Sequence, residues 1–254
     1  MRRPIVIGNW KMNMLISDAN RWVIEALNKP EYADTDIIIA PPFISLSVIK
    51  EGFKGSKIKL AGQNMSAEIV GQQTGEISGV MLKDAGCDYV ILGHSERRQS
   101  FGETDQLINK KILAACEVDL SVVFCIGESI ADRNNGESNK VIERQLSIGL
   151  EGLNERNFTR IIIAYEPNWA IGTGNNAKPN QAQDINSYVR AYCEKLFSTK
   201  LADMTRILYG GSVNSQNSRS LMEQPDVDGL LIGGASLNAE TFFNIINTSS
   251  ESVN

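Results

Sequence analysis

Three side chains in the sequence could perform acid–base chemistry on a small molecule, and each follows closely on a short apolar run. Glu166 comes directly after Ile161–Tyr165, and a carboxylate partly covered by apolar neighbours becomes basic enough to accept a proton. His94 is the only histidine, and the polar residues after it predict a helix whose positive N-terminal end disfavours imidazolium. Lys11 would supply a fixed positive charge for an anionic substrate or transition state.

The segment after Glu166 favours a catalytic glutamate over the commoner surface one. Pro167 and Gly172 could act as hinges, while Trp169 and Ile171 could cover a ligand and exclude water. We therefore predict a lid here. A lone histidine is usually structural and a lysine is usually solvated at the surface, so the same alternative applies to His94 and Lys11. Only their positions after apolar runs favour a catalytic role.

Two glycine pairs follow the last two apolar runs. Gly210-Gly211 is followed by Ser212, and Gly233-Gly234 comes later in the chain. Glycine lets backbone N–H groups approach an anion closely, although it also serves simply to form tight turns. Two pairs after consecutive strands favour a phosphate site.

Further polar groups near the same positions have supporting roles. Glu96 and Glu128 are further carboxylates, and a carboxylate near basic residues such as Arg97 and Arg98 is more often structural than catalytic. We interpret Glu96 as a supporting residue and Glu128 as a possible contact of the lid. Cys125 ends an apolar run, where a buried thiol packs as a small hydrophobic group. The four cysteines form no Cys-x-x-Cys pair, so we expect reduced thiols and no disulfide framework.

Composition excludes several function classes. The 254 residues carry a formal net charge of -5, so no global positive field favours nucleic acid or an anionic membrane surface. A single histidine excludes multi-histidine metal sites. The apolar run near the N-terminus is too short for a signal peptide, and no later run approaches a transmembrane length. We expect a soluble, cytoplasmic, unprocessed chain.

Short apolar runs recur eight times along the chain, and they must position these residues. Continuous apolar runs of this length are typical of strands buried on both faces, as in a parallel sheet. The predicted strands are Pro4–Gly8, Asp36–Ala40, Ile58–Gly62, Tyr89–Gly93, Val122–Gly127, Ile161–Tyr165, Arg206–Gly210 and Gly229–Gly233.

Segments of helical periodicity lie between the runs, for example Ser17 to Asn28, and polar starts at Ser17, Thr104 and Ser215 fit helix N-caps. Eight strand–helix units of about 32 residues each predict a single-domain α/β fold over residues 1–254, a closed (β/α)8 TIM barrel. An open doubly wound sheet is the alternative, but it would usually show a glycine-rich fingerprint after its first strand. In a barrel the carboxyl ends of all strands meet on one face, so the polar residues after the runs would converge.

Five motifs in order carry a resemblance to a known family. They are Gly8-Asn9-Trp10-Lys11-Met12-Asn13, Gly93-His94-Ser95-Glu96-Arg97-Arg98, Ala164-Tyr165-Glu166-Pro167 with Trp169 to Gly174, Tyr209-Gly210-Gly211-Ser212-Val213 and Gly233-Gly234-Ala235-Ser236-Leu237. Together they span almost the whole chain, which resembles the triosephosphate isomerase family.

The resemblance implies a cofactor-independent interconversion of dihydroxyacetone phosphate and glyceraldehyde 3-phosphate through an enediol(ate), in glycolysis and gluconeogenesis. It implies that Glu166 is the base, that neutral His94 polarises the carbonyl, and that Lys11 and Asn9 bind substrate. By the same resemblance, backbone amides of Gly172, Ser212, Gly233 and Gly234 hold the phosphate.

Supporting roles follow from the resemblance as well. Tyr209 and Ser212 would hold the closed lid, Glu128 would partner the lid residue Trp169, and Arg98 would form an ion pair with Glu103. The loop around Thr74 would insert into the neighbouring subunit of a homodimer, with Thr74 reaching toward the other active site.

A few residues depart from the family pattern. Asn168 and Asn175 stand at the two lid hinges, and Gln72-Gln73 stands at the tip of the interface loop. We expect these to affect lid rates and dimer strength more than activity.

Two other functions are compatible with the same fold: another phosphate-binding barrel enzyme, and a catalytically silent phosphate-binding homologue. Intact Lys11, His94 and Glu166 argue against the second.

Overall fold

The eight apolar runs form eight parallel strands. The computed structural model describes residues 2–30, 34–170 and 177–250, and each strand lies within one residue of its predicted bounds. The strands are β1 (Ile5–Asn9), β2 (Asp36–Ala40), β3 (Lys59–Gly62), β4 (Tyr89–Leu92), β5 (Ser121–Ile126), β6 (Ile161–Tyr165), β7 (Ile207–Tyr209) and β8 (Gly229–Ile232).

The sheet closes on itself in chain order. Every neighbouring pair is parallel, and the last strand pairs with the first, with Ile5 opposite Gly229 and Gly8 opposite Ile232. The closed barrel confirms the predicted fold class and excludes the open doubly wound sheet.

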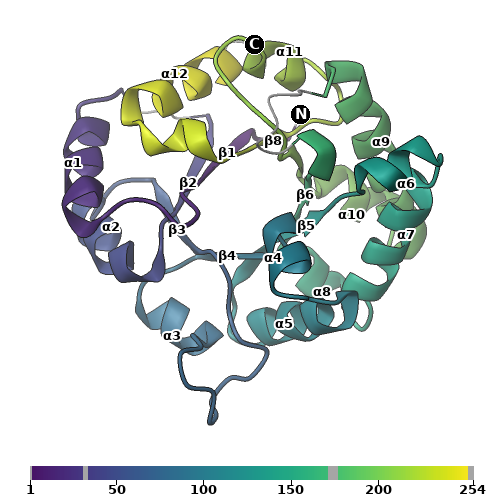
Figure 1. Ribbon diagram of the computed structural model, residues 1–254, viewed down its shortest axis with the longest axis horizontal. Coiled ribbons are helices and arrows are strands. Elements are labelled where there is room, and N and C mark those ends of the chain that lie inside the picture. The colour runs from purple at the N-terminus through teal and green to yellow at the C-terminus, as the bar shows by residue number, and fades with distance from the viewer. Residues whose placement is uncertain (1, 31–33, 171–176, 251–254) are drawn as a thin grey trace.

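Helices surround the barrel as an outer ring (Figure 1). The α-helices are α1 (Ile16–Leu27), α2 (Leu46–Gly52), α3 (Gly79–Asp84), α4 (Ser95–Ser100), α5 (Asp105–Glu117), α6 (Ile130–Asn134), α7 (Ser138–Gly149), α8 (Glu155–Phe158), α9 (Pro179–Leu196), α10 (Thr199–Met204), α11 (Ser218–Met222) and α12 (Ala239–Ser250). Short 3-10 turns are η1 (Phe43–Ser45), η2 (Asn168–Ala170) and η3 (Gly234–Leu237).

Burial on both faces explains why the strands are continuously apolar. Along β1, Ile5 and Ile7 point into the barrel interior, whereas Val6 packs outward against the helices. The interior is filled by Ile5, Ile7, Ile38, Ala40, Ala61, Ile91, Val123, Cys125, Ile162, Ala164, Leu208 and Leu231. The barrel is therefore a packed core, and a ligand can reach only its ends.

Helix starts were the less accurate part of the prediction. Thr104 does cap α5, accepting a hydrogen bond from the Leu107 amide at 3.2 Å. Ser17 does not cap α1, which begins at Ile16, because Asp18 accepts from the Leu15 amide and thereby starts the helix earlier. Ser215 lies in a turn before α11.

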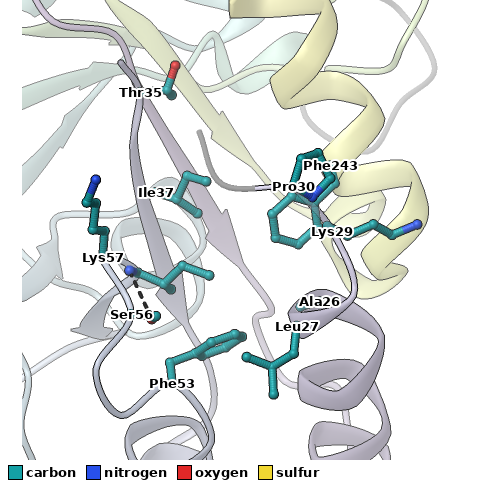
Figure 2. Close-up of a pocket in the computed structure, with 11 residues that line it drawn as sticks. Ala26, Leu27, Lys29, Pro30, Thr35, Ile37, Phe53, Ser56, Lys57 and Phe243 are labelled. Carbon is teal, nitrogen blue, oxygen red and sulfur yellow. Dashed lines mark hydrogen bonds between the residues drawn. The ribbon is translucent and has the colours of Figure 1, made fainter. Parts of the chain in front are cut away.

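A cavity of about 130 Å³ lies near the amino ends of β2 and β3. Figure 2 shows Phe53 and Phe243 among the side chains around it, with the ends of Lys29 and Lys57 extending away on opposite sides. The residues predicted to do chemistry follow the carboxyl ends of the strands, so this cavity is separate from them. Within the described ranges, no helix is long and apolar enough to cross a membrane.

Candidate functional site at the carboxyl ends of the strands

Glu166 and His94 meet directly at the carboxyl ends of β6 and β4. The Nε2 atom of His94 lies 3.0 Å from Oε1 of Glu166, and the Ser95 amide donates to Oε2 at 2.9 Å. Both side chains are buried, with Glu166 only 2% exposed. The carboxylate thus has one partner on each oxygen and is itself shielded from bulk water.

The histidine tautomer follows from its other ring nitrogen. His94 is the N-cap residue of α4, and its Nδ1 accepts a hydrogen bond from the Glu96 amide at 3.2 Å. A nitrogen that accepts carries no proton, so the ring proton is assigned to Nε2, which faces Glu166. The imidazole can therefore donate from Nε2 while it stays neutral.

Lys11 adopts a left-handed backbone conformation, with φ of 52°, which is uncommon for a residue with a side chain. Local hydrogen bonds hold it there: Asn9 Oδ1 accepts from the Lys11 amide at 3.1 Å, and Gln63 Nε2 donates to the Lys11 carbonyl at 2.9 Å. Its Nζ forms an ion pair with Glu96 at 2.6 Å. Glu96 thus orients the lysine next to His94.

The glycine turns complete one cavity of about 240 Å³. It is lined by Asn9, Lys11, His94, Glu166, Gly210, Gly211, Ser212, Val213, Leu231, Gly233, Gly234 and Ala235. A side chain at Gly210 would place its Cβ 2.9 Å from Cγ of Glu166. The predicted residues Asn9, Lys11, His94, Glu166, Ser212, Gly233 and Gly234 therefore all lie around one space.

The end of β5 holds the main chain of Glu166. The Glu166 amide donates to the Ile126 carbonyl at 2.7 Å, and the Asn168 amide donates to the Glu128 carbonyl at 3.1 Å. Between these two bonds, a Cβ on Gly127 would lie 1.8 Å from the Glu166 carbonyl oxygen. Only glycine allows this approach.

Glu128 anchors the residues that follow Glu166. Its Oε1 accepts hydrogen bonds from Trp169 Nε1 and Tyr165 Oη, both at 3.0 Å, and its side chain is fully buried. Burial, together with the Glu128 carboxylate, raises the pKa of Tyr165 far above its usual range. Tyr165 is therefore a permanent donor to Glu128.

The last described residue before the predicted lid contacts the turn after β7. Ser212 Oγ donates to the Ala170 carbonyl at 2.6 Å. Burial raises the pKa of Tyr209 to about 12. Gly172 and Asn175, to which the sequence analysis gave roles in phosphate binding and at the second hinge, lie outside the described residues.

One predicted ion pair is wrong. Arg98 does not contact Glu103; its Nε and Nη2 donate to the carbonyls of Gly93 and Cys125, and this orientation directs Nη1 to Asp105. Glu103 instead pairs with two other cations, Arg97 at 2.7 Å and the buried Lys111 at 2.5 Å.

Thr74 lies far from the cavity within a single chain. It is exposed in the loop 66–78 between β3 and α3, which projects beyond the ring of helices (Figure 1).

Cys125 belongs to the barrel interior, where burial first and then Glu166 raise the pKa of its thiol well above the ordinary value. That environment suits packing and disfavours a nucleophilic thiolate.

Two residues that shape the site received no role from the sequence alone. Gln63 Nε2 donates to the carbonyls of both Lys11 and Ala40, which links the ends of β1, β2 and β3. Its position directly after a predicted strand was the available signal. Arg133, on α6, contacts both Glu128 and Trp169, and no pattern in the sequence indicated this.

Over the described ranges, no group of three or more His, Cys, Asp or Glu side chains could hold a metal ion.

A closed (β/α)8 barrel whose lysine, histidine and glutamate surround one cavity beside two glycine turns defines a class, the barrel enzymes with a site at the carboxyl ends of the strands. The family model described as triosephosphate isomerase matches residues 4–249. The chain therefore belongs to the triosephosphate isomerase family.

Individual relatives agree with the family match. A triosephosphate isomerase of Geobacter metallireducens is 48% identical over 248 residues, covering 97% of this chain and 99% of the relative. Those of Geotalea uraniireducens and Caldanaerobacter subterraneus are 46% and 45% identical over 247 residues, covering 97% of this chain and 98% and 100% of the relatives. The similarity thus includes the whole barrel.

Proposed function

We propose that this chain interconverts dihydroxyacetone phosphate and D-glyceraldehyde 3-phosphate through an enediol(ate), with Glu166 as base and His94 as electrophile. The observation that carries the proposal is the 3.0 Å contact between Glu166 and His94 in a cavity that Lys11 also lines. The reaction moves a proton between neighbouring carbons and is redox-neutral, so the proposal includes no cofactor.

Substrate binding must exchange the partners of Glu166. The carboxylate of Glu166 lies at the Nε2–H of His94, so a substrate carbonyl oxygen that accepts from this donor takes the place of Glu166 Oε1. Glu166 then accepts the proton from the carbon next to the carbonyl, and the electron pair moves onto the carbonyl oxygen, which His94 stabilises. Glu166 then returns its proton to the former carbonyl carbon, while the proton of the neighbouring hydroxyl passes to the former carbonyl oxygen, so that the new carbonyl forms on the first carbon.

The rest of the cavity supports binding of the anionic group. Lys11 carries the positive charge, and Asn9 holds the lysine main chain in its left-handed conformation. Backbone amides of Ser212, Gly233 and Gly234 bind the phosphate, since glycine turns leave N–H groups accessible to an anion. The bound phosphate is held by local groups, which is compatible with a net charge of -5.

A homodimer is part of the proposal. The projecting loop 66–78 and the start of α3 enclose an apolar hollow of about 580 Å³, lined in part by Ile69, Val70 and Met81. Val70 is 87% exposed in the single chain, an unusual position for a large apolar side chain unless a partner covers it. A second copy docked here would bring Thr74 toward the other subunit. Light scattering at twice 27.9 kDa is the expected result, and Val70→Asp should shift it toward the monomer.

We also propose a cytoplasmic location for the reaction. Its support is that Cys87, Cys116, Cys125 and Cys193 are all buried free thiols, which persist in a reducing compartment.

The decisive experiment is a direct isomerase assay on the purified chain. Wild-type protein should convert dihydroxyacetone phosphate, and Glu166→Gln should lower turnover by at least ~10²-fold with folding and oligomeric state preserved. Glu155→Gln, at an exposed position of α8, is the matched control and should keep full activity. No conversion by the wild type would indicate another barrel enzyme or a silent homologue. Near-native turnover of Glu166→Gln would exclude Glu166 as base.

A further inference from the structure

The buried carboxylate of Glu128 has an uneven set of partners. Its Oε1 receives three donors, Tyr165 Oη, Trp169 Nε1 and, at 3.3 Å, Arg133 Nη1. Its Oε2 is buried without a hydrogen-bond partner among the described residues. A fully buried carboxylate needs a cation to offset lost hydration, and Arg133 forms the ion pair with it.

Arg133 also covers the indole of Trp169. Its guanidinium carbon lies 4.6 Å from the centroid of the Trp169 ring, within the range of a cation–π contact. One side chain of α6 therefore contacts both members of the Glu128–Trp169 hydrogen bond. The indole is held at its N–H edge by the carboxylate and across its face by the guanidinium.

The position of Trp169 is transmitted to the wall of the cavity. Trp169 is the central residue of η2, the short turn that begins two residues after Glu166. The next residue, Ala170, accepts a hydrogen bond from Ser212 Oγ at 2.6 Å, and Ser212 lines the cavity. Turning the indole would displace η2 and the hydroxyl of Ser212 with it.

We propose that Arg133 is a positioning residue of this site: by pairing with Glu128 and stacking on Trp169, it sets the orientation of η2 and thereby the Ser212 side of the cavity. Arg133 does not line the cavity, so it acts through Trp169 and not on substrate. The kinetic consequence rests on the proposed function, whereas the effect on Trp169 does not.

The test uses 5-fluorotryptophan labelling of the full-length chain. Its three tryptophans give three fluorine resonances, and Trp169→Phe assigns that of Trp169. Arg133→Met should shift and broaden the Trp169 resonance while leaving those of the fully buried Trp10 and Trp22 unchanged. Arg133→Lys keeps the charge but loses the planar face, so its spectrum should be intermediate. Arg156→Met, at an exposed position of α8, is the control.

Steady-state kinetics separate positioning from a merely structural role. Arg133→Met should raise KM for glyceraldehyde 3-phosphate about three- to tenfold with kcat within about twofold, since Glu166, His94 and Lys11 are untouched. An unchanged Trp169 resonance in Arg133→Met would overturn the proposal, as would movement of all three resonances or unchanged kinetics beside an altered Trp169. An inactive wild type refutes the proposed function instead, and the fluorine spectra still test the contact.

Discussion

Gly127→Ala tests whether the close approach between β5 and β6 positions the catalytic glutamate. The new Cβ would lie 1.8 Å from the Glu166 carbonyl oxygen, and ordinary van der Waals contact begins at 3.4 Å. The oxygen must therefore retreat by about 1.6 Å, and because it is a backbone atom no rotamer change can relieve the clash. The displaced segment carries Glu166 itself.

The size of the effect follows from that displacement. A misplacement of about 1 Å in a catalytic constellation can cost on the order of 10²-fold in rate, so kcat/KM should fall by at least ~10²-fold. Overpacking of this kind costs roughly 1–3 kcal/mol of stability. Isomerase kinetics and thermal unfolding followed by circular dichroism measure the two quantities separately.

Gly149→Ala is the matched control, because it creates a clash with a side chain of β5, the strand that precedes Gly127, but away from the cavity. Its Cβ would lie 2.3 Å from Cζ of Phe124, a buried side chain that packs outward against the helices. It should lose comparable stability and keep kcat/KM within about twofold. If Gly127→Ala folds normally and retains kcat/KM within about threefold of wild type, the contact does not position Glu166.

Two further predictions concern ionisable groups. Burial by itself would raise the pKa of Glu103, yet hydrogen bonds from Lys111 and Arg97 lower it below its ordinary value. The folded pKa is therefore below the unfolded one, so this carboxylate stabilises the fold above about pH 4.3, and the stabilisation is lost as pH falls through the folded value. Guanidinium unfolding should show Glu103→Gln losing more stability relative to wild type at pH 7 than at pH 4; an equal loss at both would contradict the linkage. Burial also raises the pKa of Cys87 and Cys193 to about 12, so a disulfide reagent at pH 8 should find almost no reactive thiol in the folded chain and four after unfolding. Rapid modification of the folded protein would refute this.

The pattern of apolar runs was sufficient to predict the barrel and the edge at which the site forms. Strands buried on both faces must be apolar at consecutive positions, so their number and bounds can be read locally. Asn9, His94 and Glu166 each lie within two residues of a strand end, and closure of a parallel barrel brings all such positions to one face. The helix starts were harder, because a side chain such as Asp18 can begin a helix before the expected cap.

Contacts between particular side chains depended on the tertiary structure. Arg98 and Glu103 are close in sequence, yet two backbone carbonyls direct Arg98 to Asp105. One is that of Gly93, just after β4, and the other is that of Cys125 in β5, 27 residues away. Glu128 meets Trp169 across 41 residues, and nothing local marks Arg133 as the cation that joins them. Apolar periodicity is a local property that specifies strands and their order, whereas partner choice depends on register and side-chain direction, which exist only once the barrel has closed.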